Sequence, residues 1–545
     1  MMANNVFETT IDKEVAFSTH AMSSKLVEQL APHTSSEVFE VFTSALIPNL
    51  RTLVNDPFAS FVLESCMKIA TLRALSSNVE ISEETEKEEE PANKKRKFHK
   101  VSTCLNYNLN LDLKLKHKTY CQEFVTKVAR FMLNNLEDYI NENNANHLIR
   151  SCILCLSGII SLKNHFNKFE STNLITEKGV KIPAEFGEIV VEFAERLMLW
   201  PQFAEMAFNE SASVVLQNLC QALKNHEGQN STLKKLVKTI MKKSFKDESE
   251  TEDPEEFKAF SSTASVHLLE SMMDACDEKL LNKIYKKFFK SKFLELCESS
   301  KLNFAVQRLI DATKDKETYE EIFNTMSPEF AKLLQVGHTG VVLAVCKACE
   351  RLGVKQGQFI QSLLKALECS AENTGKCIMP ILSLMPLSVI EAKAEAAGIT
   401  LHGSLILQHI FRFNKPIKII QTLLDMKPQD VSEIFCDQKG SRIADAYLDS
   451  KFIGEKSREK LIKHLEGMYL KMAMSKSGAF VLEKFYKLSS DSYKEVIVKE
   501  LAERMNQLTS SVSGRIICYK FSVEAYGKSV NQWRSYLHRP VANNQ

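Results

Sequence analysis

A short pattern recurs along this chain of 545 residues at a nearly fixed interval. It consists of a small residue and then five positions: a first that is mostly polar, a bulky or basic second, two apolar residues, and a fifth that is again mostly polar. The stretch ASFVLE at residues 59–64 is one copy. Eleven copies place the first position at residues 24, 60, 146, 213, 266, 303, 340, 404, 441, 479 and 515. Six of the ten intervals lie between 36 and 38 residues, a regularity that chance would not produce.

The pattern has the geometry of a helix with one core face. Positions four residues apart share a helical face, so the first and fifth positions point together, with the second beside them. The third and fourth positions then point into the core. A fixed period with helical patterning predicts an α-solenoid, in which each unit buries one face against its neighbours. Because the chain has only 17 Gly and 13 Pro, we predict an all-α fold with one solenoid over residues 15–535.

The longer intervals predict insertions between units. EETEKEEE carries a net charge of −5 and is followed by KKRKFHK with +5, while DESETEDPEE carries −7. Such composition is typical of disordered segments. The remaining chain is modestly basic, which permits contact with nucleic acid. We assign insertions to residues 74–105, 163–190 and 246–257, and a C-terminal tail to residues 536–545.

The sequence lacks the signatures of several classes of function. The N-terminus lacks the basic and apolar pattern of a signal peptide, and no stretch approaches 18 uncharged apolar residues, so we expect no membrane span. GxxxxGK[ST], GxGxxG, HExxH and GxSxG are absent. The pairs Cys152/Cys155 and Cys346/Cys349 lie within predicted helices and are interpreted as buried thiols. We therefore expect no enzymatic activity, no catalytic residue, no metal and no cofactor.

Several units resemble the repeats of the pumilio (PUF) family. The resemblance is carried by DPFASFVLESC, SKLNFAVQRLI, DQKGSRIADAYL and SKSGAFVLEKF, and extends from residue 20 to about residue 535. It implies short helical units whose second helices line a concave RNA-binding surface, with one base read per repeat. In that family the first and fifth positions contact the edge of a base and the second stacks on bases. Eleven units with large insertions are most similar to a branch of the family that works in small-subunit ribosome biogenesis.

The resemblance assigns RNA-binding roles unit by unit. Pairs that resemble the family's base code are Ser24/Glu28, Ser60/Glu64 and Ser441/Asp445 for guanine, Asn303/Gln307 for uracil, and Ser213/Gln217 and Ser404/Gln408 for adenine. Pairs without a standard match are Asn146/Arg150, Val266/Glu270, Gly340/Ala344, Ala479/Glu483 and Arg515/Tyr519. Stacking groups are offered by Lys25, Phe61, His147, His267, Phe304, Arg442 and Phe480, but not by Val214, Val341, Leu405 and Ile516. We therefore expect a short or relaxed sequence preference, with phosphate contacts supplying much of the affinity. In any single unit such a polar pair is more often a solvated helix face, but its recurrence favours a binding surface.

The resemblance also implies a place in the cell and a set of partners. These are the nucleus and nucleolus, single-stranded and structured precursor ribosomal RNA, and proteins of the pre-ribosomal particle, with the chain acting as a monomeric, non-enzymatic factor or steric guard in small-subunit (18S-type) RNA processing. The run Lys94, Lys95, Arg96 and Lys97 is typical of a nuclear-import signal. Two alternatives stay open: a protein-interaction α-solenoid adaptor that holds a peptide, and a pumilio-type messenger-RNA regulator.

Overall fold

The computed structural model describes residues 2–75, 97–163, 169–173, 179–246, 257–369, 373–392 and 397–537. The chain forms two compact units, Met1–Ile284 and Tyr285–Gln545, which we call the N-terminal and C-terminal units. Both are built by repetition of a long helix, a short helix and a helix that carries one copy of the sequence pattern.

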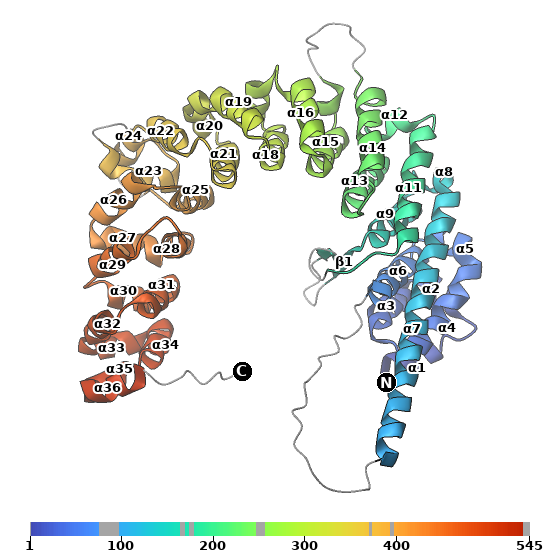
Figure 1. Ribbon diagram of the computed structural model, residues 1–545, viewed down its shortest axis with the longest axis horizontal. Helices are drawn as coiled ribbons and strands as arrows, with labels where there is room; N and C mark the ends of the chain where they lie inside the picture. Colours follow the sequence, from blue (N-terminus) through green and yellow to red (C-terminus); the bar gives the residue numbers. More distant parts are fainter. Residues whose placement is uncertain are drawn as a thin grey trace. The chain divides into compact units, whose positions relative to one another are not determined.

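We call the helices that carry the pattern motif helices. In the N-terminal unit they are α3 (Ala21–Leu30), α6 (Ala59–Leu75), α9 (Asn143–Leu156), α13 (Glu210–Asn225) and α15 (Thr263–Ala275). In the C-terminal unit they are α18 (Asn303–Ala312), α21 (Thr339–Leu352), α25 (Leu401–Phe411), α28 (Ser441–Asp449), α31 (Lys476–Leu488) and α34 (Val512–Lys520). Within each unit, consecutive motif helices pack directly against one another (Figure 1). All eleven copies of the pattern thus lie on stacked helices, and the predicted α-solenoid is confirmed.

The other helices form the layer behind the motif helices. The long first helices are α4 (Ser36–Leu46), α7 (Lys97–Asn134), α11 (Ala184–Leu199), α14 (Asn230–Lys243), α16 (Glu278–Ile284), α19 (Lys316–Met326), α22 (Gln356–Ala366), α26 (Ile417–Asp425), α29 (Glu455–His464) and α32 (Asp491–Glu503). The short connecting helices are α5 (Leu50–Asn55), α8 (Leu136–Tyr139), α12 (Phe203–Met206), α17 (Phe293–Glu298), α20 (Phe330–Gln335), α23 (Ile378–Ser383), α27 (Pro428–Cys436), α30 (Tyr469–Met474) and α33 (Met505–Ser510). Further helices are α1 (Met2–Glu8), α2 (Glu14–Thr19), α24 (Leu387–Ala392), α35 (Val523–Lys528) and α36 (Val530–Leu537).

A polar residue caps the start of most motif helices, three residues before the small residue of the pattern. The Asp56 carboxylate accepts a hydrogen bond from the N–H of Ala59 at 2.8 Å, and Asp437 accepts one from Gly440 at 2.8 Å. The same place is taken by Asn209, Ser262, Ser299, Thr400, Ser475 and Ser511, each of which accepts a bond from the corresponding N–H. These caps satisfy backbone N–H groups that have no partner within the helix, and so fix where each motif helix begins.

In several copies of the pattern a small residue is required because the motif helix starts very close to the end of the preceding short helix. A Cβ atom at Gly440 would lie 2.0 Å from the carbonyl oxygen of Ile434, and one at Gly514 would lie 1.9 Å from that of Leu508. Gly403 has a similar approach, at 2.2 Å, to the carbonyl oxygen of Leu382. In these units only glycine allows the short helix and the motif helix to pack at this distance.

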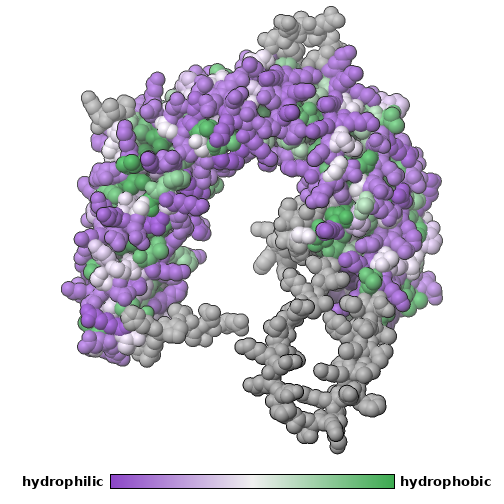
Figure 2. Space-filling model, viewed as in Figure 1, coloured by the Kyte–Doolittle hydropathy of each residue, from purple (hydrophilic) through white to green (hydrophobic). Residues whose placement is uncertain are grey.

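The core lies between the motif helices and the layer behind them. The third and fourth positions of the pattern are buried in ten copies, as Val62 and Leu63 are on α6. The exception is Leu26 on α3, which the pattern placed in the core but whose side chain is 48% exposed. Figure 2 shows that the visible surface is mostly hydrophilic, with small separate hydrophobic patches. No helix in the described residues combines the length and apolar character needed to cross a membrane.

Within the described residues, the chain departs from the expected all-helical architecture at one place. Strands β1 (Ile159–Lys163) and β2 (Phe169–Asn173) form an antiparallel two-stranded sheet between α9 and α11, where we expected part of an insertion. Helix α11 also begins inside the insertion assigned to residues 163–190, and α7 makes residues 97–105 helical. Most of the predicted charged insertion (76–96), the acidic segment 247–256 and the tail residues 538–545 lie outside the described residues.

The contrast between Leu63 and Leu26 gives a test of the core. Replacing the fully buried Leu63 by Ala should lower the free energy of unfolding by about 2–5 kcal/mol, because a cavity opens between helices. Leu26→Ala removes the same atoms from the third position of the α3 copy, where about half of the side chain is already in water. Chemical denaturation of both variants measures the difference. Equal losses of stability would contradict the assignment of the core face.

Candidate nucleic-acid interface

The second position of the pattern faces solvent on nearly every motif helix. Phe61, Phe304 and Phe480 are 45%, 59% and 65% exposed, although their neighbours at the third and fourth positions are buried. Lys25, His267, Arg442 and Ile516 are exposed as well, while His147, Val214 and Leu405 are partly exposed. The exception is Val341 on α21, which is fully buried. The predicted orientation of Phe61 and Phe304 is thus confirmed, and their contact with bases stays a prediction.

The first position is mostly buried, and in three repeats its side chain bonds to the backbone of the next repeat. The Ser213 hydroxyl donates a hydrogen bond to the carbonyl of Ala264 at 2.9 Å, and Ser404 donates to Lys439 at 2.7 Å. Asn146 Nδ2 donates at 2.6 Å to Ile140 and at 3.3 Å to Ser211 in the next repeat. Ser24, Ser60, Asn303 and Ser441 are also buried. Ser213, Ser404 and Asn146 thus join successive repeats, whereas Ser24, Asn303 and Ser441 bond within their own repeat. The expected contact of first-position side chains with a base edge stays a prediction.

The first position also orients the fifth. The side-chain amide of Gln217 donates to the Ser213 hydroxyl at 3.0 Å, and Gln408 donates to Ser404 at 3.0 Å. In the same way Gln307 donates to Asn303 Oδ1 at 2.9 Å. Three of the predicted pairs are therefore in contact across one helical turn. Each bond fixes the orientation of the side-chain amide and leaves its oxygen and a second N–H to bond to a partner.

The remaining predicted residues differ in their surroundings. Glu270 is partly exposed and lies 3.4 Å from the His267 imidazole, and the exposed Arg515 donates to the backbone carbonyl of Thr509 at 3.0 Å. Glu28 is partly exposed on α3. The α21 copy is different, because its first, second and fifth positions, Gly340, Val341 and Ala344, offer no polar side chain. Lys94, Lys95 and Arg96 lie outside the described residues, and Lys97 is the first residue of α7.

Phe61 and His147 are stacked on each other. Their ring centroids lie 4.3 Å apart and the ring planes are inclined by 15°. We expected two separate stacking groups on neighbouring repeats, but the rings of α6 and α9 are in contact and form a single aromatic surface. A base can stack on the outer side of this pair, whereas insertion between the rings would require the pair to open.

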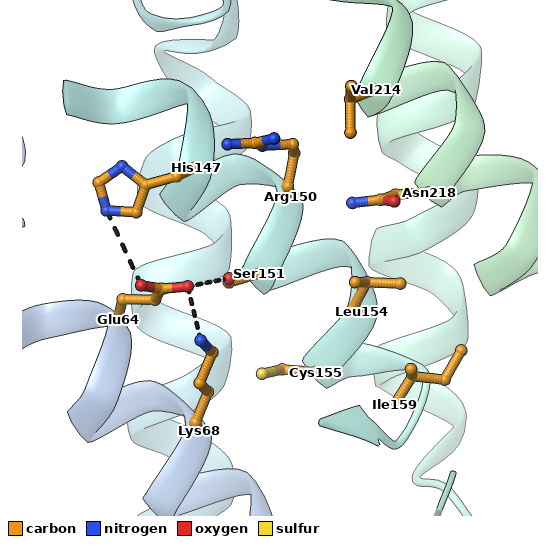
Figure 3. Close-up of a pocket in the computed structure, with 10 residues that line it drawn as sticks. All are labelled: Glu64, Lys68, His147, Arg150, Ser151, Leu154, Cys155, Ile159, Val214 and Asn218. Atoms are coloured by element: carbon orange, nitrogen blue, oxygen red, sulfur yellow. Dashed lines mark hydrogen bonds and ion pairs between the residues drawn. The ribbon is translucent and has the colours of Figure 1, made fainter. Parts of the chain in front are cut away.

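A cavity of about 240 Å³ lies beside this pair, between α6, α9 and α13 (Figure 3). The Glu64 carboxylate lies 2.7 Å from Lys68 Nζ, accepts a hydrogen bond from the Ser151 hydroxyl, and is 4.0 Å from His147 Nε2. Arg150 also borders the cavity. The fifth positions of two successive repeats, one acidic and one basic, therefore open into the same cavity.

The charged groups of this cavity are shielded from water. Burial lowers the pKa of the His147 imidazole, and the neighbouring Glu64 carboxylate only partly opposes this effect. Burial also lowers the pKa of Arg150, whose Nε is buried without a hydrogen-bond partner. A guanidinium N–H without an acceptor is unfavourable in a buried setting. The cavity therefore offers an unsatisfied donor beside a carboxylate acceptor, which suits a ligand with a polar edge.

The cysteine pairs have a structural role, as predicted. Cys152 and Cys155 on α9, and Cys346 and Cys349 on α21, are all buried. Burial raises the pKa of the Cys155 and Cys349 thiols to about 12. These thiols are therefore protonated at neutral pH and act as small apolar side chains.

Residues that the sequence analysis missed lie one place after the fifth position. Ser151 bonds to the fifth-position Glu64 of the preceding repeat, and Lys484 and Lys520 form ion pairs with Asp445 and Glu483 in the same relation. We call this place the sixth position. Extending the alignment of the repeats by one residue would have singled out these polar side chains beside the fifth position.

Stacked three-helix repeats with a row of solvent-facing second positions define an α-solenoid of the pumilio type. A family model described as the NOP9-like PUF repeat domain matches residues 12–516. The chain belongs to this family.

Individual relatives agree with this assignment. Nucleolar protein 9 of Mus musculus is 27% identical over 289 residues, covering 49% of this chain and 45% of the relative. Pumilio homolog 23 of Arabidopsis thaliana is 28% identical, covering 49% of this chain and 36% of the relative. Nucleolar protein 9 of Schizosaccharomyces pombe is 20% identical, covering 98% and 78%. The chain thus spans less than half the length of the mouse and Arabidopsis relatives that it matches.

Solved structures share the fold. The structure of APUM23-GGAAUUGACGG has a TM-score of 0.72 and is 19% identical, covering 98% of this chain and 94% of that chain. The structure of APUM23-GGAGUUGACGG has a TM-score of 0.70 with the same identity and coverage.

The buried imidazole gives a testable pH dependence. The unfolded chain has an ordinary histidine pKa near 6.5, and burial holds that of native His147 below this value, so the unfolded state binds the proton more readily. The contribution of His147 to stability is therefore lost as the pH falls through about 6.5. His147→Phe keeps an aromatic ring against Phe61 and should lose less stability than the wild type between pH 7.5 and 5.5. Identical profiles in urea denaturation would contradict this effect.

Proposed function

We propose that the chain is a nucleolar RNA-binding protein that holds precursor ribosomal RNA during small-subunit RNA maturation and does not cut it. The observation that carries this proposal is the row of solvent-facing aromatic and cationic side chains at the second positions, with Phe304, Arg442 and Phe480 in the C-terminal unit. Aromatic side chains at regular intervals are suited to stacking on successive bases. Membership of the NOP9-like family and the names of the relatives support the choice of ribosomal RNA.

The surface supports tolerant rather than strict base reading. Some repeats offer an oriented glutamine at the fifth position, as Gln307 and Gln408 do, whereas the α21 repeat offers no polar side chain. Single-stranded segments can therefore be read in part and structured segments held through their phosphates. The absence of catalytic sequence motifs supports a role as a steric guard. Proteins of the pre-ribosomal particle are proposed as neighbours, and a monomer as the working form.

Two exposed phenylalanines test RNA binding without disturbing the core. Phe304→Ala and Phe480→Ala should each weaken binding by about 1–3 kcal/mol, because a stacking surface for one base is lost. Phe452→Ala is the matched control, since Phe452 is 49% exposed but lies outside the motif helices. Affinity is measured by fluorescence anisotropy, and thermal melting checks folding.

Crosslinking in cells, followed by sequencing of the bound RNA, identifies the target. We expect the wild-type reads to gather on precursor ribosomal RNA and the Phe304→Ala/Phe480→Ala double variant to lose them. Reads on messenger RNA would favour a messenger-RNA regulator, and the absence of bound RNA from the wild type would favour a protein-interaction adaptor. Cleavage of bound RNA by the purified protein would contradict the role as a guard.

The basic run is the proposed nuclear-import signal. Replacing Lys94, Lys95, Arg96 and Lys97 by Ala should shift a fluorescent fusion of the full chain toward the cytoplasm, because import receptors recognise clustered positive charge. The matched control replaces the three lysines by Arg, which keeps the charge and should keep the nucleolar signal. An unchanged distribution of the alanine variant would contradict the assignment of the run.

A further inference from the structure

Two fifth-position acids in the C-terminal unit are held by lysines from the following repeat. Lys484 Nζ on α31 lies 3.0 Å from Asp445 Oδ1 on α28 and 2.7 Å from Asp449 Oδ2. Lys520 Nζ on α34 donates to both carboxylate oxygens of Glu483, at 2.8 and 2.7 Å. Both lysines occupy the sixth position of their repeat, so the two ion pairs repeat the same geometry one step along the stack.

The pairs lie at the surface that we propose to bind RNA. Asp445, Glu483 and Lys484 are partly exposed and Lys520 is exposed. The burial of Lys484 opposes its positive charge, but hydrogen bonds to Asp449 and Asp445 outweigh that effect and raise its pKa. Lys484 is therefore charged at neutral pH, and the acid beside it is neutralised rather than free.

A lysine placed in this way changes what the acid can recognise. A free carboxylate only accepts hydrogen bonds, so it favours a base edge that presents N–H donors, as that of guanine does. Glu483 already accepts bonds on both oxygens. The Nζ group adds donors of its own, which suit acceptors that every base presents, either a carbonyl oxygen or a ring nitrogen. The carboxylate and the lysine together therefore present both hydrogen-bond acceptors and donors, and so discriminate only weakly among the four bases.

The lysine is not a general requirement of the fold. At the sixth position of the α9 repeat, Ser151 takes the equivalent place and donates a hydrogen bond to the fifth-position Glu64. His409, at the sixth position of α25, forms a hydrogen bond with the Glu350 carboxylate on the preceding α21. The side chain at the sixth position thus bonds to a carboxylate of the preceding repeat in each case, but its chemical type differs between repeats. The residue at this position can therefore change the hydrogen-bonding properties of that carboxylate.

We propose that Lys484 and Lys520 are specificity-determining residues that restrain Asp445 and Glu483 and so suppress guanine selection by the α28 and α31 repeats. This inference rests on the proposed RNA binding. In this proposal the sixth-position lysine, which lies outside the first, second and fifth positions, controls how selectively the repeat binds one base over the others.

The test compares base preference before and after removal of each lysine from the full chain. Lys484→Met and Lys520→Met keep most of the apolar stem and remove the charge. Lys487→Met, which removes an exposed lysine of the same helix α31, is the matched control. The probe is an RNA recovered by crosslinking, synthesised with each of the four bases at each position in turn, and affinities are measured at several salt concentrations.

We expect each variant to gain roughly a fivefold to hundredfold preference for guanine at one position, the range of a good base contact. The two affected positions should be different, and Lys487→Met should leave all preferences unchanged. Adding Glu483→Gln to Lys520→Met should abolish the gain, because the freed acid is then lost. Thermal melting should stay close to that of the wild type, since surface ion pairs add little stability.

Two outcomes would overturn the proposal. One is a uniform loss of affinity for all bases with a salt dependence that falls by about one charge, which would make the lysines phosphate contacts. The other is unchanged base preference and affinity in both variants. Wild-type chain that binds no RNA would instead contradict the proposed function, so the two failures are distinguishable.

Discussion

The motif helices that begin near Gly403, Gly440 and Gly514 start almost in contact with a carbonyl group of the preceding short helix, and the architecture of these repeats depends on that close approach. Where the distance is smallest, as at Gly440 and Gly514, there is no room for a Cβ atom. The approach brings the N-terminal end of each of these motif helices close to the preceding helices of its repeat. It also fixes the direction of the second position, because a helix that starts at a defined place and buries its third and fourth positions has only one rotation left.

Much of the fold could be predicted from the sequence because its information is local. The small residue, the apolar pair and the polar positions lie within six residues. Their recurrence predicts a stack of helices without any knowledge of the tertiary contacts. The caps at Asp56 and Asp437 are equally local and would have strengthened the prediction. The pattern was wrong at Leu26, whose side chain is 48% exposed on α3, the first motif helix; the pattern within one copy does not contain what packs over a given helix face.

The candidate site was less predictable because its contacts join different repeats. The stacking of Phe61 on His147 links residues on either side of a long insertion, and no periodicity in the sequence indicates how two rings are inclined. The burial of Val341 depends on how α21 packs against its neighbours. The ion pairs of Lys484 and Lys520 depend on the offset between consecutive helices, which a pattern within one repeat does not contain.

The hydrogen bonds from Ser213 and Ser404 to the next repeat have a consequence for how such a surface can change over time. A side chain that positions a reading group and also ties two repeats together cannot be exchanged for the sake of one task alone. If these repeats bind RNA as we propose, mutations at Ser213 or Ser404 also loosen the stack, whereas Ala479 and Gly340 have no such side-chain bond to lose. Recoding of this solenoid would therefore best begin at Ala479 and Gly340 and retain the hydroxyl donors of Ser213 and Ser404.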